Sequence, residues 1–234
     1  MKVRAVVGFL CVAIALGAFV LVRRTPTWFA PPARDDAAAI DRGERLESAL
    51  IEQFTRVRAP DASTWSIAFD DDAANAWLAT RLPRWIEHFE ARSAGGPRQR
   101  EVVQLRFLRD AVELGLSRPG TPFASATLAP RLTAGELTAP VTGGGVASVR
   151  LPGGALHALV GWLAAGDAEA SGGSPGGERW RSDVTALLRG ESVSPSFDLG
   201  DGRSVELLDL EIHPGELRAR LRTRRSTGAE DRPR

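Results

Sequence analysis

The feature that most constrains this chain is an uninterrupted apolar run near its N-terminus, from Ala5 to Val22. These 18 residues, AVVGFLCVAIALGAFVLV, carry no charge, and Arg23 and Arg24 follow them directly. As a helix rising about 1.5 Å per residue, the run is roughly 27 Å long, which is enough to cross the hydrocarbon core of a bilayer. The sequence therefore predicts a transmembrane helix followed by water-soluble chain.

A cleaved signal peptide is the main alternative for this run, because Lys2 and Arg4 precede it. Three features argue against cleavage. The run exceeds the usual ~7–15 residues of a signal peptide, arginines follow it, and no small-x-small site lies just beyond. A lipoprotein signal is disfavoured because Leu10 precedes Cys11 at a position where that signal needs a small residue. We expect residues 1–24 to be an uncleaved signal anchor.

The orientation of this anchor is set only weakly by charge, because basic residues flank both of its ends. Long domains are translocated largely regardless of charge, so we expect a single-pass protein of the cell membrane, with a cytoplasmic N-terminus and an extracytoplasmic domain. Residues 25–35 contain three prolines and predict a stiff stalk. Trp28 and Phe29, together with Arg23 and Arg24, are expected at the membrane surface.

The composition of the remaining chain excludes one class of partner. With Lys2, Arg4, Arg23 and Arg24 set aside, 26 of the 30 basic residues remain against 29 acidic ones, a net charge of −3. A nucleic-acid-binding domain is usually basic, so we expect no nucleic-acid partner. About 200 residues remain, a size that suits one domain with a single core.

Helical and strand patterns alternate along this domain. Asp35 and Asp36 are predicted to cap a helix that runs to about Arg58, and Trp65 to Phe69 alternate as in a strand that leads into a second helix. Pro83 is expected to break that second helix near Leu82.

Three hairpins are predicted after these helices. Arg109-Asp110 is the turn of the first, which pairs Val103, Leu105 and Phe107 with Leu116, Leu114 and Val112. The second runs from Phe123 to Val141, and Pro130 and Pro140 indicate that its strands are irregular or lie at a sheet edge. In the last, Pro214-Gly215 is the turn, and Ile212, Leu210 and Leu208 lie opposite Leu217, Ala219 and Leu221.

These patterns predict an α+β fold, in which one domain of antiparallel β-hairpins forms a curved sheet packed on amphipathic helices. The domain is expected to span residues 36–225. A Gly- and Ser-rich loop is expected at 165–178, and a frayed tail at 226–234.

Candidate chemical motifs are few. Asp70, Asp71 and Asp72 could suggest a metal site, but aspartates at a helix start favour capping of backbone N–H groups. Gly172-Gly173-Ser174-Pro175-Gly176 matches the nucleophile elbow formally, but it lacks the flanking strand and helix that this motif requires. We expect no catalytic residues, no metal and no cofactor, although a site assembled only in the folded chain stays a remote alternative.

A basic stripe lies in the last predicted strand, where arginines alternate with other residues: Arg218, Arg220, Arg222 and Arg224. The stripe could contact anionic headgroups. We favour a solvated, partly ion-paired edge strand, because Glu211 and Asp209 lie opposite two of the arginines in the predicted register.

The order of these parts resembles a known group of proteins. The anchor, the strand leading into Asn75-Ala76-Trp77-Leu78, the successive hairpins and Arg150-Leu151-Pro152 before a helix resemble the YpmS-like bacterial membrane-anchored proteins. More distantly, they resemble tubular lipid-binding modules of the TULIP type. The resemblance implies a curved antiparallel sheet around a long helix, with an apolar groove for a lipid chain.

Two functions are expected from this reasoning. The first is a non-enzymatic domain that binds a lipid or another apolar component of the envelope. Its apolar lining is predicted to comprise Trp77, Trp85, Phe89, Phe107, Leu114 and Trp162. The second is a structural or assembly partner of another envelope protein, bound by strand addition at an exposed sheet edge near Phe123 to Val141.

Overall fold

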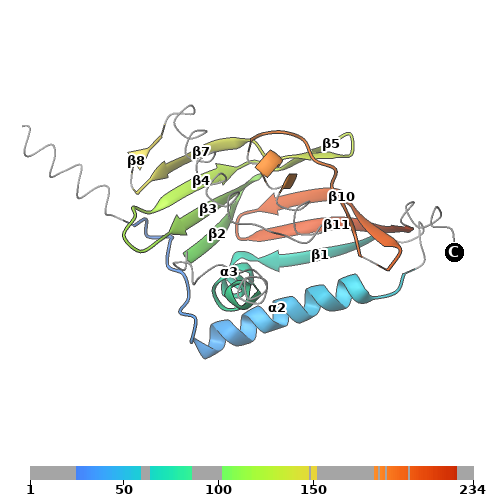
Figure 1. Cartoon of the computed structure of the whole chain (residues 1–234), viewed down its shortest axis with the longest axis horizontal. Coiled ribbons are helices and arrows are strands. Elements are labelled where there is room, and N and C mark those ends of the chain that lie inside the picture. The colour runs from blue at the N-terminus through green and yellow to red at the C-terminus, as the bar shows by residue number, and fades with distance from the viewer. Residues whose placement is uncertain are drawn as a thin grey trace, which may run out of the picture.

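The computed structural model describes residues 25–58, 64–85, 102–147, 149–151, 182–183, 185–187, 189–199 and 201–225. Antiparallel strands dominate them (Figure 1). The two longer helices are α2 (Ala37–Thr55) and α3 (Asp71–Thr80). The strands are β1 (Thr64–Asp70), β2 (Val102–Leu108), β3 (Ala111–Ser117), β4 (Ala124–Leu128), β5 (Arg131–Thr133), β6 (Glu136–Thr138), β7 (Val141–Val146), β8 (Val149–Arg150), β9 (Ser196–Asp198), β10 (Arg203–His213) and β11 (Glu216–Arg225).

The predicted fold class is wrong. The strands do not form one curved sheet on several amphipathic helices but separate into a four-stranded sheet, β1-β11-β10-β9, a five-stranded sheet, β2-β3-β4-β7-β8, and the two-stranded β5-β6. Among the described residues, helices are few and most of the regular structure is antiparallel β-sheet. The hairpin patterns predicted which strands pair within a hairpin, but they carried no information on which hairpins become neighbours.

The expected single-pass membrane architecture is also corrected. Within the described ranges, no helix is long and apolar enough to cross a membrane. The run from Ala5 to Val22, on which the prediction depended, lies outside the described residues, as do Arg23 and Arg24.

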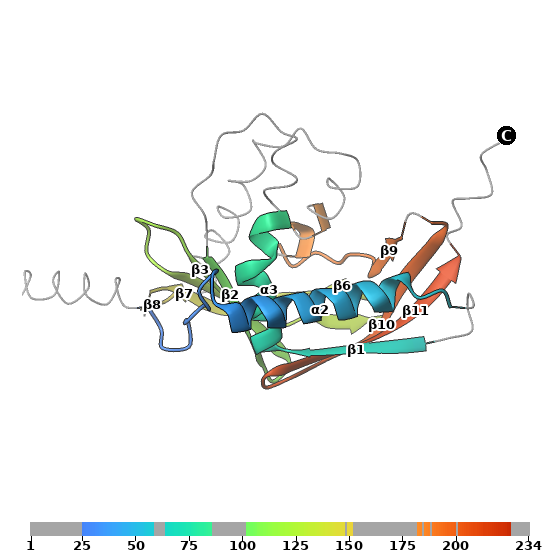
Figure 2. The same ribbon diagram turned by 90° about the horizontal axis from the view of Figure 1, so that it is seen from below.

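Helix α2 begins as the sequence predicts, because the Asp36 side chain accepts a hydrogen bond from the Ala38 N–H at 2.9 Å. It ends at Thr55, three residues before the predicted end. Ala39 and Gly43 are its buried residues, and the helix packs against α3 (Figure 2). A Cβ atom at Gly43 would lie 2.7 Å from Thr80 Oγ1, so the two helices approach more closely than a larger side chain would permit.

Helix α3 also begins at a predicted cap. The Asp70 side chain accepts from the Ala73 N–H at 2.6 Å, which is the capping role expected for this aspartate. The helix ends at Thr80, and a separate helical turn follows at residues 82–85, consistent with a break caused by Pro83.

The first predicted hairpin is confirmed pair by pair. Val103 lies opposite Leu116, Leu105 opposite Leu114 and Phe107 opposite Val112, and the same register brings Arg106 beside Glu113. Their guanidinium and carboxylate groups are 2.6 Å apart. The second hairpin is interrupted at both prolines, as expected for irregular strands. It is divided into two pairs of strands: β4 pairs with β7, and β5 pairs with β6. Between the two pairs, the Ala129 N–H donates a hydrogen bond to Pro140 O.

The last hairpin, β10 with β11, has the predicted turn and a bulge that the sequence did not predict. Ile212 pairs with Leu217 and Leu210 with Ala219, but Leu207 rather than Leu208 lies opposite Leu221. The register shifts between Leu207 and Asp209, which leaves Leu208 as the extra residue of a β-bulge. The prediction that this last strand lies at a sheet edge is wrong, because β1 pairs along the other side of β11.

The two larger sheets meet at the tip of this last hairpin. The Gly215 N–H donates to Phe107 O at 3.0 Å, and the Asp110 N–H donates to Ile212 O at 3.0 Å. Gly215 has φ +83°, a conformation that a side chain disfavours, so glycine is suited to this tip. Apolar side chains from both sheets and α3 form the core there: Ala74, Phe107 and Ile212, with Phe69, Leu105, Val112, Leu210 and Leu217 packed around them.

Candidate functional site

The predicted apolar lining does not form a site in the described part of the chain. Phe107 is in the buried core, and Leu114 pairs with Leu105 in the middle of a sheet. Trp77 is half-buried on α3. Phe89 and Trp162 lie outside the described residues.

The remaining residue of that lining, Trp85, is at the surface. Its side chain is 45% exposed, and the indole N–H donates to Glu47 Oε1 at 3.1 Å. A polar contact of this kind orients the ring at the surface instead of directing it into an apolar interior. Lipid binding therefore has no support among the described residues and stays a prediction.

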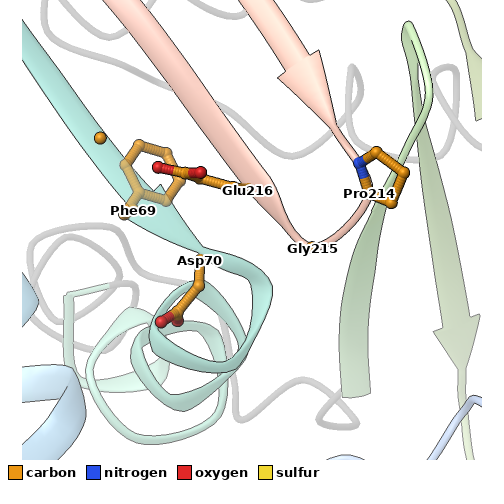
Figure 3. A pocket seen from close by; sticks show the side chains of 6 residues that line it. Phe69, Asp70, Pro214, Gly215 and Glu216 are labelled. Carbon is orange, nitrogen blue, oxygen red and sulfur yellow. The ribbon is translucent and has the colours of Figure 1, made fainter.

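The described residues do form an open depression at the hairpin tip, with a volume of about 470 Å³ (Figure 3). It is lined by Ala68, Phe69, Asp70, Pro214, Gly215 and Glu216. Asp70 and Glu216 are opposite each other in the β1–β11 register. Asp70 already caps α3, and Glu216 receives two hydrogen bonds from Arg218, at 2.9 and 3.1 Å. Both carboxylates therefore have structural partners.

Asp71 lies beside this depression and has a perturbed carboxyl group. Burial, followed by the nearby charges of Asp72 and Asp70, raises its pKa above the ordinary value of an aspartate. Its backbone N–H donates to Gly215 O at 3.1 Å. The perturbation thus results from the position of Asp71 at the junction of the two sheets. Among the described residues, no group of three or more His, Cys, Asp or Glu side chains could hold a metal ion.

The aromatic residues expected at a membrane surface, Trp28 and Phe29, pack against the five-stranded sheet. Their rings form a cluster with Phe123, with centroid separations of 4.7 to 5.9 Å. Gly115 lies beneath this cluster, where an added Cβ would be 2.7 Å from both Trp28 and Phe29. The guanidinium of Arg106 stacks over the Trp28 ring at 4.8 Å. The segment around Trp28 and Phe29 is therefore bound to the domain.

Each arginine of the predicted basic stripe has an acidic partner. These pairs are Arg218 with Glu216, Arg220 with Asp209, and both Arg222 and Arg224 with Glu206, all within 3.3 Å. The ion-paired interpretation of this stripe is confirmed, although it lies on an interior strand.

The region of the predicted sheet edge, Phe123 to Val141, includes residues of four strands. β5 and β6 form a two-stranded sheet in which both strands are at an edge, whereas β4 and β7 belong to the five-stranded sheet. β4 lies between β3 and β7, and β7 lies between β4 and β8, so neither of these two strands is at an edge. A partner cannot add a strand to β4 or β7 without displacing one of these neighbours.

A different surface gathers exposed apolar groups at the C-terminal end of α2, close to β9 (Figure 2). We call it the arginine–aromatic patch, and it comprises Ile51, Phe54, Val57, Arg58, Trp65 and Phe197. The Phe54 ring makes edge contacts with Trp65 and Phe197, at centroid separations of 5.3 and 5.4 Å. Arg58 stacks over Trp65 at 4.2 Å. The end of α2, the segment that follows it and the second residues of β1 and β9 thus meet in this region.

The apolar side chains of this patch are unusually exposed to solvent. Ile51 is 50% exposed, Val57 is 86% exposed and Phe197 is 44% exposed. Together with Trp85, they are the large apolar side chains that the described residues leave exposed. Single exposed apolar residues are normal on a soluble domain, whereas a group of them is typical of a binding surface.

Three arginines lie at the patch, but only one of them has no carboxylate partner. Arg56 pairs with Glu52 at 2.9 Å and Arg203 with Asp201 at 2.6 Å. Within the described residues, Arg58 forms no ion pair. It donates to the backbone oxygen of Gln53 and, at 2.6 Å, to Gln53 Oε1. Burial and the charges of Arg56 and Arg203 lower the pKa of its guanidinium.

Comparisons with known proteins do not assign this surface. A scan against protein families, a search of curated proteins and a search of solved structures gave no match for the chain. The resemblance to YpmS-like and TULIP-type proteins therefore stays a prediction.

Sequence reasoning did not find the arginine–aromatic patch. It placed Phe54 and Val57 in a helix that runs to about Arg58, and it gave Phe197 no role. One signal was available, because Ile51 lies outside the helical spacing of Ile40, Gly43 and Leu50 and was an apolar residue without a predicted partner. The contribution of Phe197 could not be found in this way, since it depends on a contact between residues 143 positions apart.

Proposed function

We propose that this domain binds another protein, which docks on the arginine–aromatic patch. The observation that carries the proposal is the contact of the Phe54 ring with Trp65 and Phe197, together with the exposure of Phe197 and of Ile51 and Val57, which are each three residues from Phe54 in the chain. Tryptophan, phenylalanine and arginine are enriched in protein interfaces. Phe54, Trp65 and Arg58 therefore suit the centre of such an interface, and the exposed aliphatic residues suit its surroundings.

The charge of the patch favours a different protein over a second copy of this chain. A two-fold dimer uses the same surface on both subunits, so it would bring two Arg58 side chains without ion partners into one interface. Like charges in an interface are costly. A partner of different sequence has no such constraint.

The test is site-specific photo-crosslinking of the full chain in cells that produce it. A photoreactive benzoylphenylalanine replaces Val57 in the patch, or Ala49, an exposed residue on the opposite side of α2, as the matched control. We expect a discrete adduct with another protein from position 57 that is absent from position 49. The substitution Phe197→Ser should abolish this adduct.

Three results would overturn the proposal: no adduct at position 57, equal adducts at both positions, or an adduct that contains only two copies of this chain. Because Phe197 is 44% exposed, its replacement removes little core packing, and the variant should remain folded. Circular dichroism and thermal unfolding of the purified variant check that it does.

A further inference from the structure

We infer that the partner presents a carboxylate flanked by apolar side chains, and that Arg58 receives this carboxylate. The inference rests on the proposed function and specifies the chemistry of the docking segment. It is carried by the contrast between Arg58 and the two arginines beside it, Arg56 and Arg203.

The position of Arg58 is fixed before any partner binds. The face of its guanidinium lies over the Trp65 ring at 4.2 Å, and Trp65 is held by a hydrogen bond from its Nε1 to Thr223 Oγ1 at 3.2 Å. Gln53 accepts from both terminal nitrogens of Arg58. Preorganisation of this kind reduces the entropy lost when a partner binds.

Donor capacity remains on the fixed guanidinium. An arginine has five N–H donors, and the Nε–H group of Arg58 has no acceptor among the described residues. The Nε edge of a guanidinium suits a carboxylate, which can accept two parallel hydrogen bonds. Gln53 supplies a neutral oxygen and leaves the positive charge uncompensated.

The surroundings strengthen this preference. Val57 precedes Arg58 in the chain, and Phe197 contacts the Phe54 ring, which packs on the Trp65 ring under Arg58. Once a partner covers these exposed apolar side chains, they exclude water from the ion pair. A charge pair in such an environment is stronger than one at an open surface. Leaving Arg58 covered but unpaired would be costly, so the same surroundings select against partners that lack an acidic group.

A carboxylate fits the site better than a phosphate. Arg56 and Arg203 already pair with Glu52 and Asp201, so Arg58 is the one guanidinium at the patch that has no ion pair within the described ranges. A doubly charged phosphate normally draws on several donors or cations, whereas one aspartate or glutamate matches one arginine.

The probes are two sets of fluorescent twelve-residue peptides, tested by fluorescence anisotropy with the full chain. The acidic set carries one Asp or Glu among Leu and Phe at varied spacings. The amide set is identical except that Asn or Gln replaces the acid. We expect members of the acidic set to bind about tenfold more tightly than their amide counterparts, because a charge-assisted hydrogen bond is stronger than a neutral one.

Two variants locate the effect. Arg58→Met keeps an apolar side chain over Trp65 and should remove the preference for acid over amide without abolishing apolar binding. Arg45→Met is the matched control, because Arg45 is exposed on the same helix, pairs only with Asp41 at 3.0 Å and faces away from the patch. It should keep the wild-type preference.

The outcomes distinguish this inference from the proposed function. Equal binding of acid and amide peptides, a preference that persists in Arg58→Met, or no peptide binding at all would overturn the carboxylate inference. The docking function would still stand if the adduct at position 57 forms. If that adduct is absent as well, the docking function itself fails.

Discussion

The side-chain amide of Asn75 pairs with the main chain of Leu105 in both directions. Its Nδ2 donates to Leu105 O at 2.7 Å, and its Oδ1 accepts from the Leu105 N–H at 2.8 Å. Leu105 lies on β2, an outer strand of the five-stranded sheet. One side chain of α3 therefore takes the place that a neighbouring strand would occupy, and it fixes the helix to this edge.

Replacing Asn75 with alanine should destabilise the protein. The side chain is 7% exposed, so the change leaves the Leu105 N–H and C=O groups buried without partners. Each such group costs about 1–3 kcal/mol, and we expect a loss of about 2–4 kcal/mol from the free energy of unfolding. Urea denaturation measures it. Asn75→Asp, which keeps the acceptor and loses the donor, should also change the free energy of unfolding. Unchanged stability of both variants would contradict a stabilising role of the two hydrogen bonds between Asn75 and Leu105.

The close approach of α2 and α3 predicts a second effect. In Gly43→Ala, the new Cβ would lie 2.7 Å from Thr80 Oγ1 and 3.1 Å from the backbone oxygen of Ala76, so the helices must separate. We expect a loss of about 1–3 kcal/mol, which is typical of overpacking, despite the better helix propensity of alanine. Thermal unfolding measures the loss. The comparison is Gly143→Ala, whose Cβ would meet Thr127 Oγ1 at an ordinary 3.5 Å. A stabilised Gly43→Ala would show that the helices adjust freely.

The ion pair between Glu47 and Arg81 joins the same two helices and predicts a dependence on pH. The hydrogen bond from Arg81, and a second one from Trp85, lower the pKa of the Glu47 carboxyl. A group whose pKa is lowered on folding contributes stability above its unfolded pKa of about 4.3, and this contribution is lost as the pH falls through the lowered value.

Glu47→Gln should therefore lower the free energy of unfolding at pH 7 by about 1–2 kcal/mol, since the pair is neither fully exposed nor fully buried. The difference from the wild type should shrink at pH 2–3. Denaturant titrations at both pH values measure it. Glu52→Gln removes an exposed pair with Arg56 and should cost less than about 0.5 kcal/mol. A loss that is the same at both pH values would rule out the ionic contribution.

Asp71 predicts the opposite pH dependence. Its pKa is raised on folding, so its ionised form destabilises the native state, and stability decreases as the pH rises from about 3.9 through the raised value. Asp71→Asn keeps a side-chain acceptor and removes the charge. We expect this variant to be more stable than the wild type at pH 7, with a difference that disappears below about pH 3.5.

Thermal unfolding across this pH range tests the prediction. Glu136→Gln, at the exposed first residue of β6, is the control. If Asp71→Asn were less stable than the wild type at pH 7, the ionised carboxylate would be stabilising the junction between the sheets.

Local features of this fold could be predicted from the sequence because they depend on nearby residues. The pairing of Phe107 with Val112 follows from alternation around a short turn, and the cap at Asp36 follows from one side chain at a helix start. Even here the prediction had a limit. The bulge at Leu208 depends on how β10 is held between β11 and Pro195, whose backbone oxygen accepts from the Leu207 N–H at 2.9 Å.

The division into separate sheets and the arginine–aromatic patch could not be predicted in this way. Both depend on contacts between distant parts of the chain, such as Gly215 with Phe107 and Phe54 with Phe197. Periodicity shows that a residue has a buried or an exposed side, but it does not show which element covers it.

The pairing of β1 with β11 has a consequence for how the chain is made. Trp65 and Thr223, joined by a side-chain hydrogen bond, are 158 residues apart, so the four-stranded sheet cannot close until nearly the whole chain has been synthesised. Contacts of such long range slow folding. During translation β1 emerges early and must wait, with its apolar face unprotected, for the last strand to arrive. Removal of β11 would therefore affect more than the C-terminal part of the fold. It would also leave β1, far away in the sequence, unpaired and prone to aggregation.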